Sequence, residues 1–398
     1  MRRFATMFPF VALAAWGASE ATRDGFESRL TFVSGVVMIV CGAFGCFLDF
    51  RRRIAVAATV LAAAGVWYFV TASHERLRGE KPFTGPATSS APYRVPKPPE
   101  PPAPDRPLVF VAWGDARGGA SVFARVCDAI RTERPAFSIG LGDLIGMARP
   151  YQFEILRHQL DETGVPGFVV PGNHDIDPYG SLGPYESVFG PSDWRFDLRD
   201  VSFFAVNSAA GPVSEASARR FADEATEAFA RKRRVVLFTH HPPFPPNGKP
   251  HKCMPQDDPN VKALQATLEA VHATTFSGDW HAHDVRTIGH VTQHVSGGAG
   301  SKLEYDGLHH FLRVTVTPTS IDVEKVDLPP RHESPDFDDR WTTFREEASY
   351  VARTDPWRVF TLLLGGGGAL GALLSIAVPR RAGRSRDAKA SGGPPQTP

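Results

Sequence analysis

Short clusters rich in Asp and His follow several apolar runs of this sequence, and their residue types suit metal binding and acid–base chemistry. The clusters span residues 114–118, 142–143, 172–175, 240–243 and 281–283. Each comes after a short β-branched or aromatic run, which is the composition of a buried strand. Because the carboxyl ends of strands in an open α/β sheet border one crevice, side chains distant in sequence can meet there. Carboxylates mixed with imidazoles bind Zn, Mn or Fe, and one carboxylate can bridge two ions.

The candidate metal ligands each offer an oxygen or an imidazole nitrogen at a strand end: Asp115, Asp143, Asn173, His240, His281 and His283. Asp143 follows the second strand and is the better candidate to be shared by two ions. His281 and His283 are two residues apart, so in a loop both can turn toward one centre. His174 lies between Asn173 and Asp175, the arrangement expected of an imidazole that a carboxylate holds for proton transfer. His174 and Asp175 are therefore the candidate catalytic residues.

The elements around these clusters predict a layered α/β fold, because strand-like runs alternate with helical patterns. Helices are expected at residues 121–134, 151–162, 216–231 and 260–272. Hairpin-like pairs at residues 194–206 and 311–326 break the alternation and predict antiparallel pieces in a second sheet.

Four uncharged apolar stretches, residues 4–19, 31–47, 54–71 and 359–378, approach the about 20 residues that a helix needs to cross a bilayer. The first is short and follows Met-Arg-Arg, so a signal peptide is the competing interpretation. Arginines at residues 2–3, 51–53 and 380–386 belong on the cytoplasmic side, and four spans satisfy that rule without conflict. The sequence therefore predicts a multi-pass protein of the cell membrane with cytoplasmic termini.

The expected organisation follows from these spans and from a change of composition between them. In order, it comprises a membrane region of three helices (1–72), a Pro-rich linker (73–106), a globular domain (107–328), a juxtamembrane connector (329–357), a transmembrane helix (358–379) and a basic tail (380–398). The linker is expected to be an extended, semi-rigid spacer. In this topology the globular domain is extracytoplasmic.

The net charge bears on the expected partners, and the cysteines bear on a possible disulfide. The 398 residues carry a formal net charge of only +1, and no basic groove interleaved with aromatic residues is evident, so a nucleic-acid partner is not expected. Cys127 and Cys253 are the cysteines of the globular region, and export would permit a disulfide between them.

The order of the clusters resembles the calcineurin-like metallophosphoesterases, whose pattern runs D-x-H, G-D, G-N-H-[DE], H and G-H-x-H. The resemblance covers most of the globular region, from Asp115 to His283. It implies a sandwich of two mixed sheets flanked by helices. It also implies one ion held by Asp115, Asp143 and His283, and another held by Asp143, Asn173, His240 and His281. In such a site His174 stabilises the departing or equatorial oxygen.

The activity implied by the resemblance is hydrolysis of a phosphate mono- or diester by metal-bound hydroxide, with two divalent or trivalent ions of Mn, Zn or Fe as cofactors. A lipid-linked phosphoester is one candidate substrate, given the expected tethering to a membrane. The alternative is a non-hydrolysing module that binds a phosphorylated ligand through a degenerate first metal site. A complete Gly-Asn-His-Asp block favours the enzyme.

Two departures from the family pattern concern this site directly. Arg117 stands where the pattern has its first His, so the first ion loses a ligand and that site is expected to be weaker. Three roles remain open: water fills the gap, the guanidinium binds the substrate phosphate alongside Asn173, or the arm points away and is structural. In the second departure, Asp279 and Trp280 precede His281 where the family usually has Gly.

Overall fold

The structure is a computed structural model that describes residues 99–103, 106–305 and 307–329, together with residues 342, 343, 345–347, 349, 350 and 353. All strands and helices from β1 to β11 belong to one compact unit, residues 75–350. The four expected membrane spans, the basic tail, and most of the linker and connector lie outside the described residues. Within the described part of the chain, no helix is both long enough and apolar enough for a membrane span.

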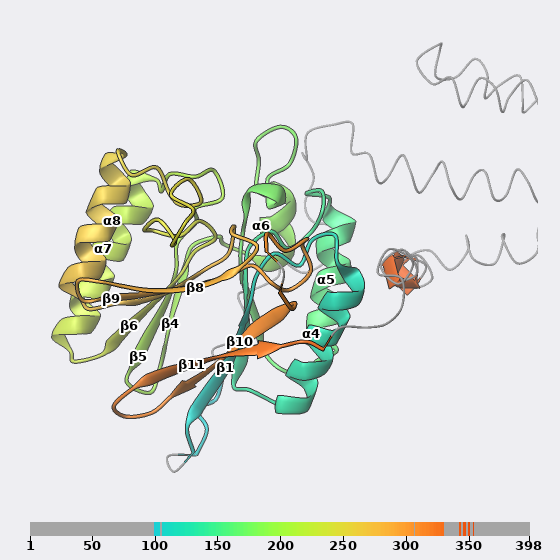
Figure 1. Cartoon of the computed structure of the whole chain (residues 1–398), viewed down its shortest axis with the longest axis horizontal. Helices are drawn as coiled ribbons and strands as arrows, with labels where there is room; N and C mark the ends of the chain where they lie inside the picture. Colours follow the sequence, from blue (N-terminus) through green and yellow to red (C-terminus); the bar gives the residue numbers. More distant parts are fainter. Residues whose placement is uncertain are drawn as a thin grey trace, which may run out of the picture. The chain divides into compact units, whose positions relative to one another are not determined.

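Two mixed sheets form the centre of this unit (Figure 1). The first has the order β11 (Ile321–Asp327), β10 (His310–Val316), β1 (Leu108–Trp113), β2 (Phe137–Leu141) and β3 (Gly167–Val170). The second has the order β4 (Trp194–Leu198), β5 (Val201–Ala205), β6 (Arg234–Phe238), β7 (Thr274–Ser277), β9 (Val291–Ser296) and β8 (His283–Ile288). Within them β1, β2 and β3 pair in parallel, as do β5, β6, β7 and β9, whereas β10, β11, β4 and β8 pair antiparallel.

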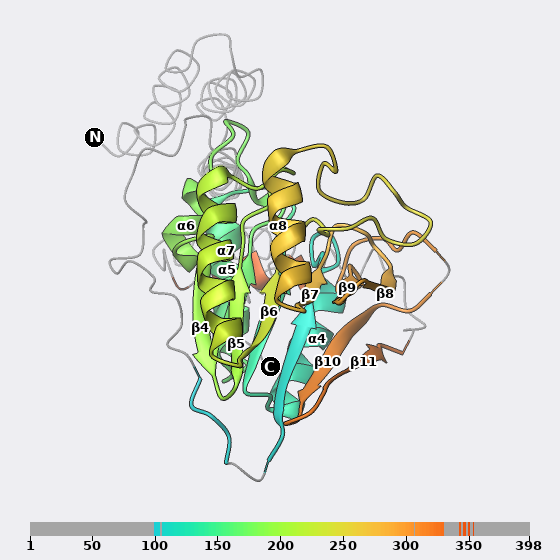
Figure 2. The same cartoon turned by 90° about the vertical axis from the view of Figure 1, so that its left-hand side faces the viewer.

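Helices cover the outer face of each sheet. The first sheet packs on α4 (Ala120–Glu133), α5 (Pro150–Asp161) and α6 (Gly183–Phe189), and the second on α7 (Glu215–Ala230) and α8 (Pro259–Ala270). Figure 2 shows α7 and α8 side by side on the same face. The remaining turn, η2 (Asn173–Asp175), is a short 3-10 helix after β3.

The alternation of side chains along each strand explains these layers. In β1, Phe110 lies in the apolar layer between the sheets, whereas Val111 and Trp113 face α4 and α5. Phe110 stacks on Phe137 with ring centroids 4.8 Å apart, and further Phe rings from both sheets complete this layer. The aromatic layer fixes the two sheets relative to each other, and therefore fixes the ends of their strands.

The predicted pair of mixed sheets flanked by helices is confirmed. The four expected helices and the two hairpins match α4, α5, α7 and α8, and β4–β5 and β10–β11, to within two residues at the ends. Sequence analysis did not predict β8, β9 or α6. Cys127 and Cys253 are free thiols.

Candidate metal centre

Three Gly-Asp pairs follow strands β1, β2 and β7, and their aspartates are Asp115, Asp143 and Asp279. All three adopt left-handed backbone conformations, with φ of 59°, 50° and 63°. Asp tolerates this region better than most residues, but the conformation is costly and tends to occur at functional sites. The side chains are buried. Three carboxylates are thus turned into the interior where the strands end.

The preceding glycines allow these groups to approach one another. A Cβ on Gly142 would lie 2.4 Å from Nδ1 of His240, and a Cβ on Gly278 would lie 2.7 Å from Oδ2 of Asp115. Both distances are too short for any side chain, so glycine is required for this close packing.

The first group of potential ligands consists of Asp115, Asp143 and His281. His281 Nε2 lies 3.4 Å from Asp115 Oδ1, while its Nδ1 lies 3.0 Å from the carbonyl oxygen of Lys302. If Nδ1–H donates to that carbonyl, the Nε2 lone pair faces a carboxylate oxygen, and a proton or a metal cation must separate them. Asp115 Oδ1 is buried without a hydrogen-bond partner in the described structure, as expected of an atom that binds a cation.

The second group surrounds Nε2 of His240 and contains His241 and Asp279. His240 Nε2 lies 3.1 Å from Asn173 Oδ1, 3.4 Å from Asp143 Oδ1 and 3.9 Å from Asp279 Oδ1. Its Nδ1 lies 2.9 Å from the Leu141 carbonyl oxygen, which orients the ring as an outer partner orients a metal-binding imidazole. Three oxygen atoms therefore converge on one imidazole nitrogen.

Asp143 belongs to the first group and also faces the second. Its Oδ2 accepts a hydrogen bond from Arg117 Nε at 2.9 Å, and its Oδ1 accepts one from the His174 backbone N–H at 3.0 Å while facing His240. Burial raises the pKa of Asp143, but the charge of His240 and the His174 N–H lower it, and the net pKa is below the usual value. The predicted sharing of Asp143 by two sites therefore has a geometric basis.

Buried charge also shifts the pKa values of the other members. Burial is the largest cause of the raised pKa of Asp115. For His240, burial lowers the pKa, but the carboxylates of Asp143, Asp115 and Asp279 together raise it by more, so the net pKa is above its usual value. The centre is thus an anionic pocket that holds positive charge. Carboxylates, imidazoles and an amide oxygen fit Mn, Fe or Zn.

The structure places the two late histidines differently from the predicted assignment. His281, rather than His283, lies beside Asp115, and Asp279 occupies the position near His240 that had been assigned to His281. His283 begins β8, and its ring lies 5.8 Å from the His310 ring, outside both ligand groups. The prediction treated residues 281–283 as one loop, but β8 begins at His283, and it is His281 that lies beside Asp115.

Asp279 is the site residue that sequence analysis missed. The signal was present, because Gly278-Asp279 repeats the Gly-Asp pairs at Asp115 and Asp143, each directly after a strand. It was obscured by treating Asp279 as a substitute for the glycine before His281. His241 was expected only to pack or line the pocket, yet it belongs to the second group.

Asp175 does not contact the His174 imidazole as predicted. Its carboxylate accepts hydrogen bonds from the N–H groups of Gly172 at 2.7 Å and Leu144 at 3.1 Å. It therefore ties the turn that carries Asn173 to the loop that follows Asp143. Burial and then the charge of Asp143 raise the pKa of Asp175 to about 7, whereas the two N–H groups lower it. Asp175 is a positioning residue rather than a catalytic one.

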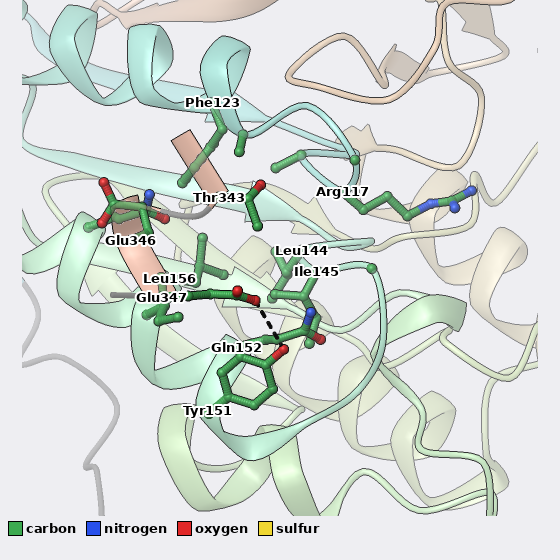
Figure 3. A pocket seen from close by; sticks show the side chains of 16 residues that line it. Arg117, Phe123, Leu144, Ile145, Tyr151, Gln152, Leu156, Thr343, Glu346 and Glu347 are labelled. Atoms are coloured by element: carbon green, nitrogen blue, oxygen red, sulfur yellow. Dashed lines mark hydrogen bonds between the residues drawn. The ribbon is translucent and has the colours of Figure 1, made fainter. Parts of the chain in front are cut away.

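A cavity of about 170 Å³ adjoins the centre on the Arg117 side (Figure 3). Phe123 and Leu156 contribute apolar walls, and Tyr151 and Glu347 contribute polar ones. The Tyr151 hydroxyl lies 3.4 Å from Glu347 Oε1, so helical residues from the 342–350 segment cover this side of α5. Figure 3 shows the Arg117 guanidinium directed away from this polar pair. Arg117 thus separates the cavity from Asp143, which its Nε contacts.

The sequence is similar to those of known phosphoesterases. Residues 108–283 match the family model described as calcineurin-like phosphoesterase. A probable cyclic nucleotide phosphodiesterase of Fibrobacter succinogenes is 29% identical over 157 residues, which are 37% of this chain and 57% of that protein. A glycerophosphodiester phosphodiesterase of Enterobacter lignolyticus is 24% identical over 124 residues, which are 28% of this chain and 44% of that protein. The chain thus spans about half the length of these curated relatives.

Among solved structures, a dimetal phosphatase from Danio rerio is similar at 14% identity and a TM-score of 0.45. The similarity covers 55% of this chain and 96% of that chain.

Proposed function

Residues 108–283 form a calcineurin-like phosphoesterase domain, and from this premise we propose that the chain is a metal-dependent hydrolase of phosphoric esters. The observation that carries the proposal is the position of Asp143, which belongs to the first group of ligands and lies 3.4 Å from His240 Nε2 of the second. Asp115 and His281 complete the first group, whereas His240, His241 and Asp279 form the second, with Asn173 Oδ1 also beside His240. Two ions held there would lower the pKa of a coordinated water and neutralise the phosphate charge.

The residues around the ligands are placed to bind and orient the substrate. His174 contacts Asp143 through its backbone N–H, and its side chain is half-buried and near enough to feel the charges of Asp143 and Arg117, so its imidazole would hydrogen-bond a phosphoryl or leaving-group oxygen. Arg117 presents a fixed cation whose remaining N–H groups match two phosphate oxygens. These side chains bind and orient the ester whichever metal is present.

A phosphodiester is the substrate class that the observations favour. The two curated relatives are named phosphodiesterases, which supports a diester rather than a monoester.

The proposal is tested with the purified full-length chain, supplied in turn with Mn, Fe or Zn, on a panel of phosphate mono- and diesters. Half of the panel carries alcohols of glycerol size and half carries nucleosides. Metal-dependent hydrolysis of the diesters, faster than that of the monoesters, is the expected result. Stoichiometric metal binding without turnover of any ester would instead support the non-hydrolysing binding module.

Arg117→Gln is expected to raise KM for the preferred ester about tenfold or more, because a hydrogen bond to a charged group contributes about 1.5–3 kcal/mol. The salt bridge of Arg117 to Asp143 supports a role at the centre. Steady-state kinetics measure the effect. Arg131→Gln is the matched control, since Arg131 pairs with exposed Asp128 on α4. If KM stays unchanged while metal content rises, Arg117 guards the first metal site instead of binding substrate.

We further propose that the domain is anchored to the cell membrane, faces the exterior, and acts at a membrane surface where lipid-linked esters are available. The apolar stretches of the sequence and the distribution of Arg around them support this topology. A reporter fused after Lys389 is expected to indicate the cytoplasm, and a reporter within residues 73–106 the exterior. An exterior signal from the Lys389 fusion would overturn the topology.

A further inference from the structure

Lys252 contacts the carboxylate that sequence analysis missed. Its Nζ lies 3.2 Å from Asp279 Oδ1 and 3.2 Å from the Asp279 carbonyl oxygen. The Lys252 side chain is 38% exposed, whereas that of Asp279 is 11% exposed. The ammonium group therefore lies at the solvent boundary of the second ligand group.

A continuous series of contacts runs through the centre from one cation to the other. Arg117 contacts Asp143, Asp143 faces His240 Nε2, His240 Nε2 faces Asp279, and Asp279 contacts Lys252. Arg117 and Lys252 are thus placed at opposite ends of this series. Each neutralises the carboxylate of a different ligand group.

The loop that carries Lys252 is held in place on both sides of it. This loop connects β6 to α8, and Figure 2 shows it beyond the end of α8. The Met254 N–H donates to the Pro242 carbonyl at 2.9 Å, and the Met254 side chain is fully buried. The Lys252 N–H donates to the Lys249 carbonyl at 3.1 Å. Lys252 is consequently presented by an anchored loop, which limits the entropy lost when it binds a ligand.

The donor count of Lys252 leaves capacity for an anion. An ammonium group has three N–H donors, and the two oxygens of Asp279 take two of them. The third donor, on a partly exposed side chain, can reach a ligand that enters from solvent. Lysine commonly binds phosphate in this way, as a compact point charge.

We propose that Lys252 is a substrate-binding residue that donates a hydrogen bond to a nonbridging phosphoryl oxygen, from the end of the centre opposite Arg117. The inference rests on the proposed phosphoesterase function for the identity of the substrate. It does not rest on that function for the binding of phosphate, because inorganic phosphate offers the same oxygens. Arg117 and Lys252 would then supply positive charge from the two ends of the series of contacts.

The test uses the metal-loaded full-length chain and its Lys252→Gln variant. Inorganic phosphate is titrated by calorimetry, and KM and kcat are measured on the preferred ester. The variant is expected to bind phosphate about tenfold or more weakly and to raise KM similarly, with kcat and metal content unchanged. Lys252→Arg is expected to recover part of the affinity. Lys249→Gln is the matched control, because Lys249 lies in the same loop but pairs with Glu304.

Each outcome decides the proposal. Unchanged phosphate affinity in Lys252→Gln overturns it, as does the absence of phosphate binding to the wild-type protein. Loss of metal with unchanged KM also overturns it, and would show that Lys252 only positions Asp279. If the wild-type protein hydrolyses no ester, the proposed function fails, but the phosphate titration still decides the role of Lys252.

Discussion

Asp143→Asn should abolish ester hydrolysis and remove most of the bound metal. This carboxylate belongs to the first ligand group and faces His240 of the second, and an amide provides one neutral oxygen where the charged group provides two. Loss of an outer partner of a metal ligand already costs about 10–100-fold in affinity or activity, so loss of the shared ligand should cost more. Elemental analysis and steady-state kinetics on the full-length chain measure both effects.

The variant is informative because asparagine preserves the fold at this position. Asp143 has a φ of 50°, and Asn tolerates left-handed conformations as Asp does. Asp161→Asn is the matched control: Asp161 lies on α5 with its side chain 50% exposed and pairs with Arg157. Full metal content and activity in Asp143→Asn would contradict the proposed centre. Unfolding of the variant would be detected by circular dichroism.

His281→Ala and His283→Ala should differ sharply, although the two histidines are separated by a single residue. His281 Nε2 faces Asp115, so its removal leaves two carboxylates in the first group and should lower kcat by about 100-fold or more. Metal content should fall toward one ion per chain. His283 lies outside both groups. His283→Ala should therefore keep its metal.

The pair of variants separates the structural assignment from the one predicted from sequence. Equal loss of metal in both variants, or greater loss in His283→Ala, would support the predicted ligand role of His283. His290→Ala is a third reference, because His290 is 64% exposed and lies in the turn between β8 and β9. Its metal content and kinetics should match those of the wild-type protein.

The chain order of the strands and the positions of Asp115, Asp143, Asn173 and His240 could be predicted from sequence because local rules govern them. Short apolar runs form strands, and polar residues directly after parallel strands lie at one edge of a sheet. The aromatic layer between the sheets then brings the strand ends of both sheets together. No long-range information was needed to select these residues.

The roles of His281, His283 and Asp279 depended on where β8 begins, and strand boundaries are the least certain part of a sequence-based prediction. The observed ligand positions lie two residues earlier in the chain than the predicted ones, because Asp279 takes the position assigned to His281 and His281 takes that assigned to His283. The hydrogen bond between Asp175 and the Leu144 N–H could not be predicted from sequence either, because it joins two separate loops.

The sequence by itself determined the kind of chemistry available: its Asp, Asn and His clusters at strand ends define an anionic, metal-binding pocket in an α/β fold. Only the tertiary structure decided which side chains share a centre. Asp279 meets His240, Arg117 meets Asp143, and Lys252 reaches Asp279 from a separate loop. The physical reason is that local periodicity specifies the secondary structure, whereas distances between loops are set by how the two sheets pack.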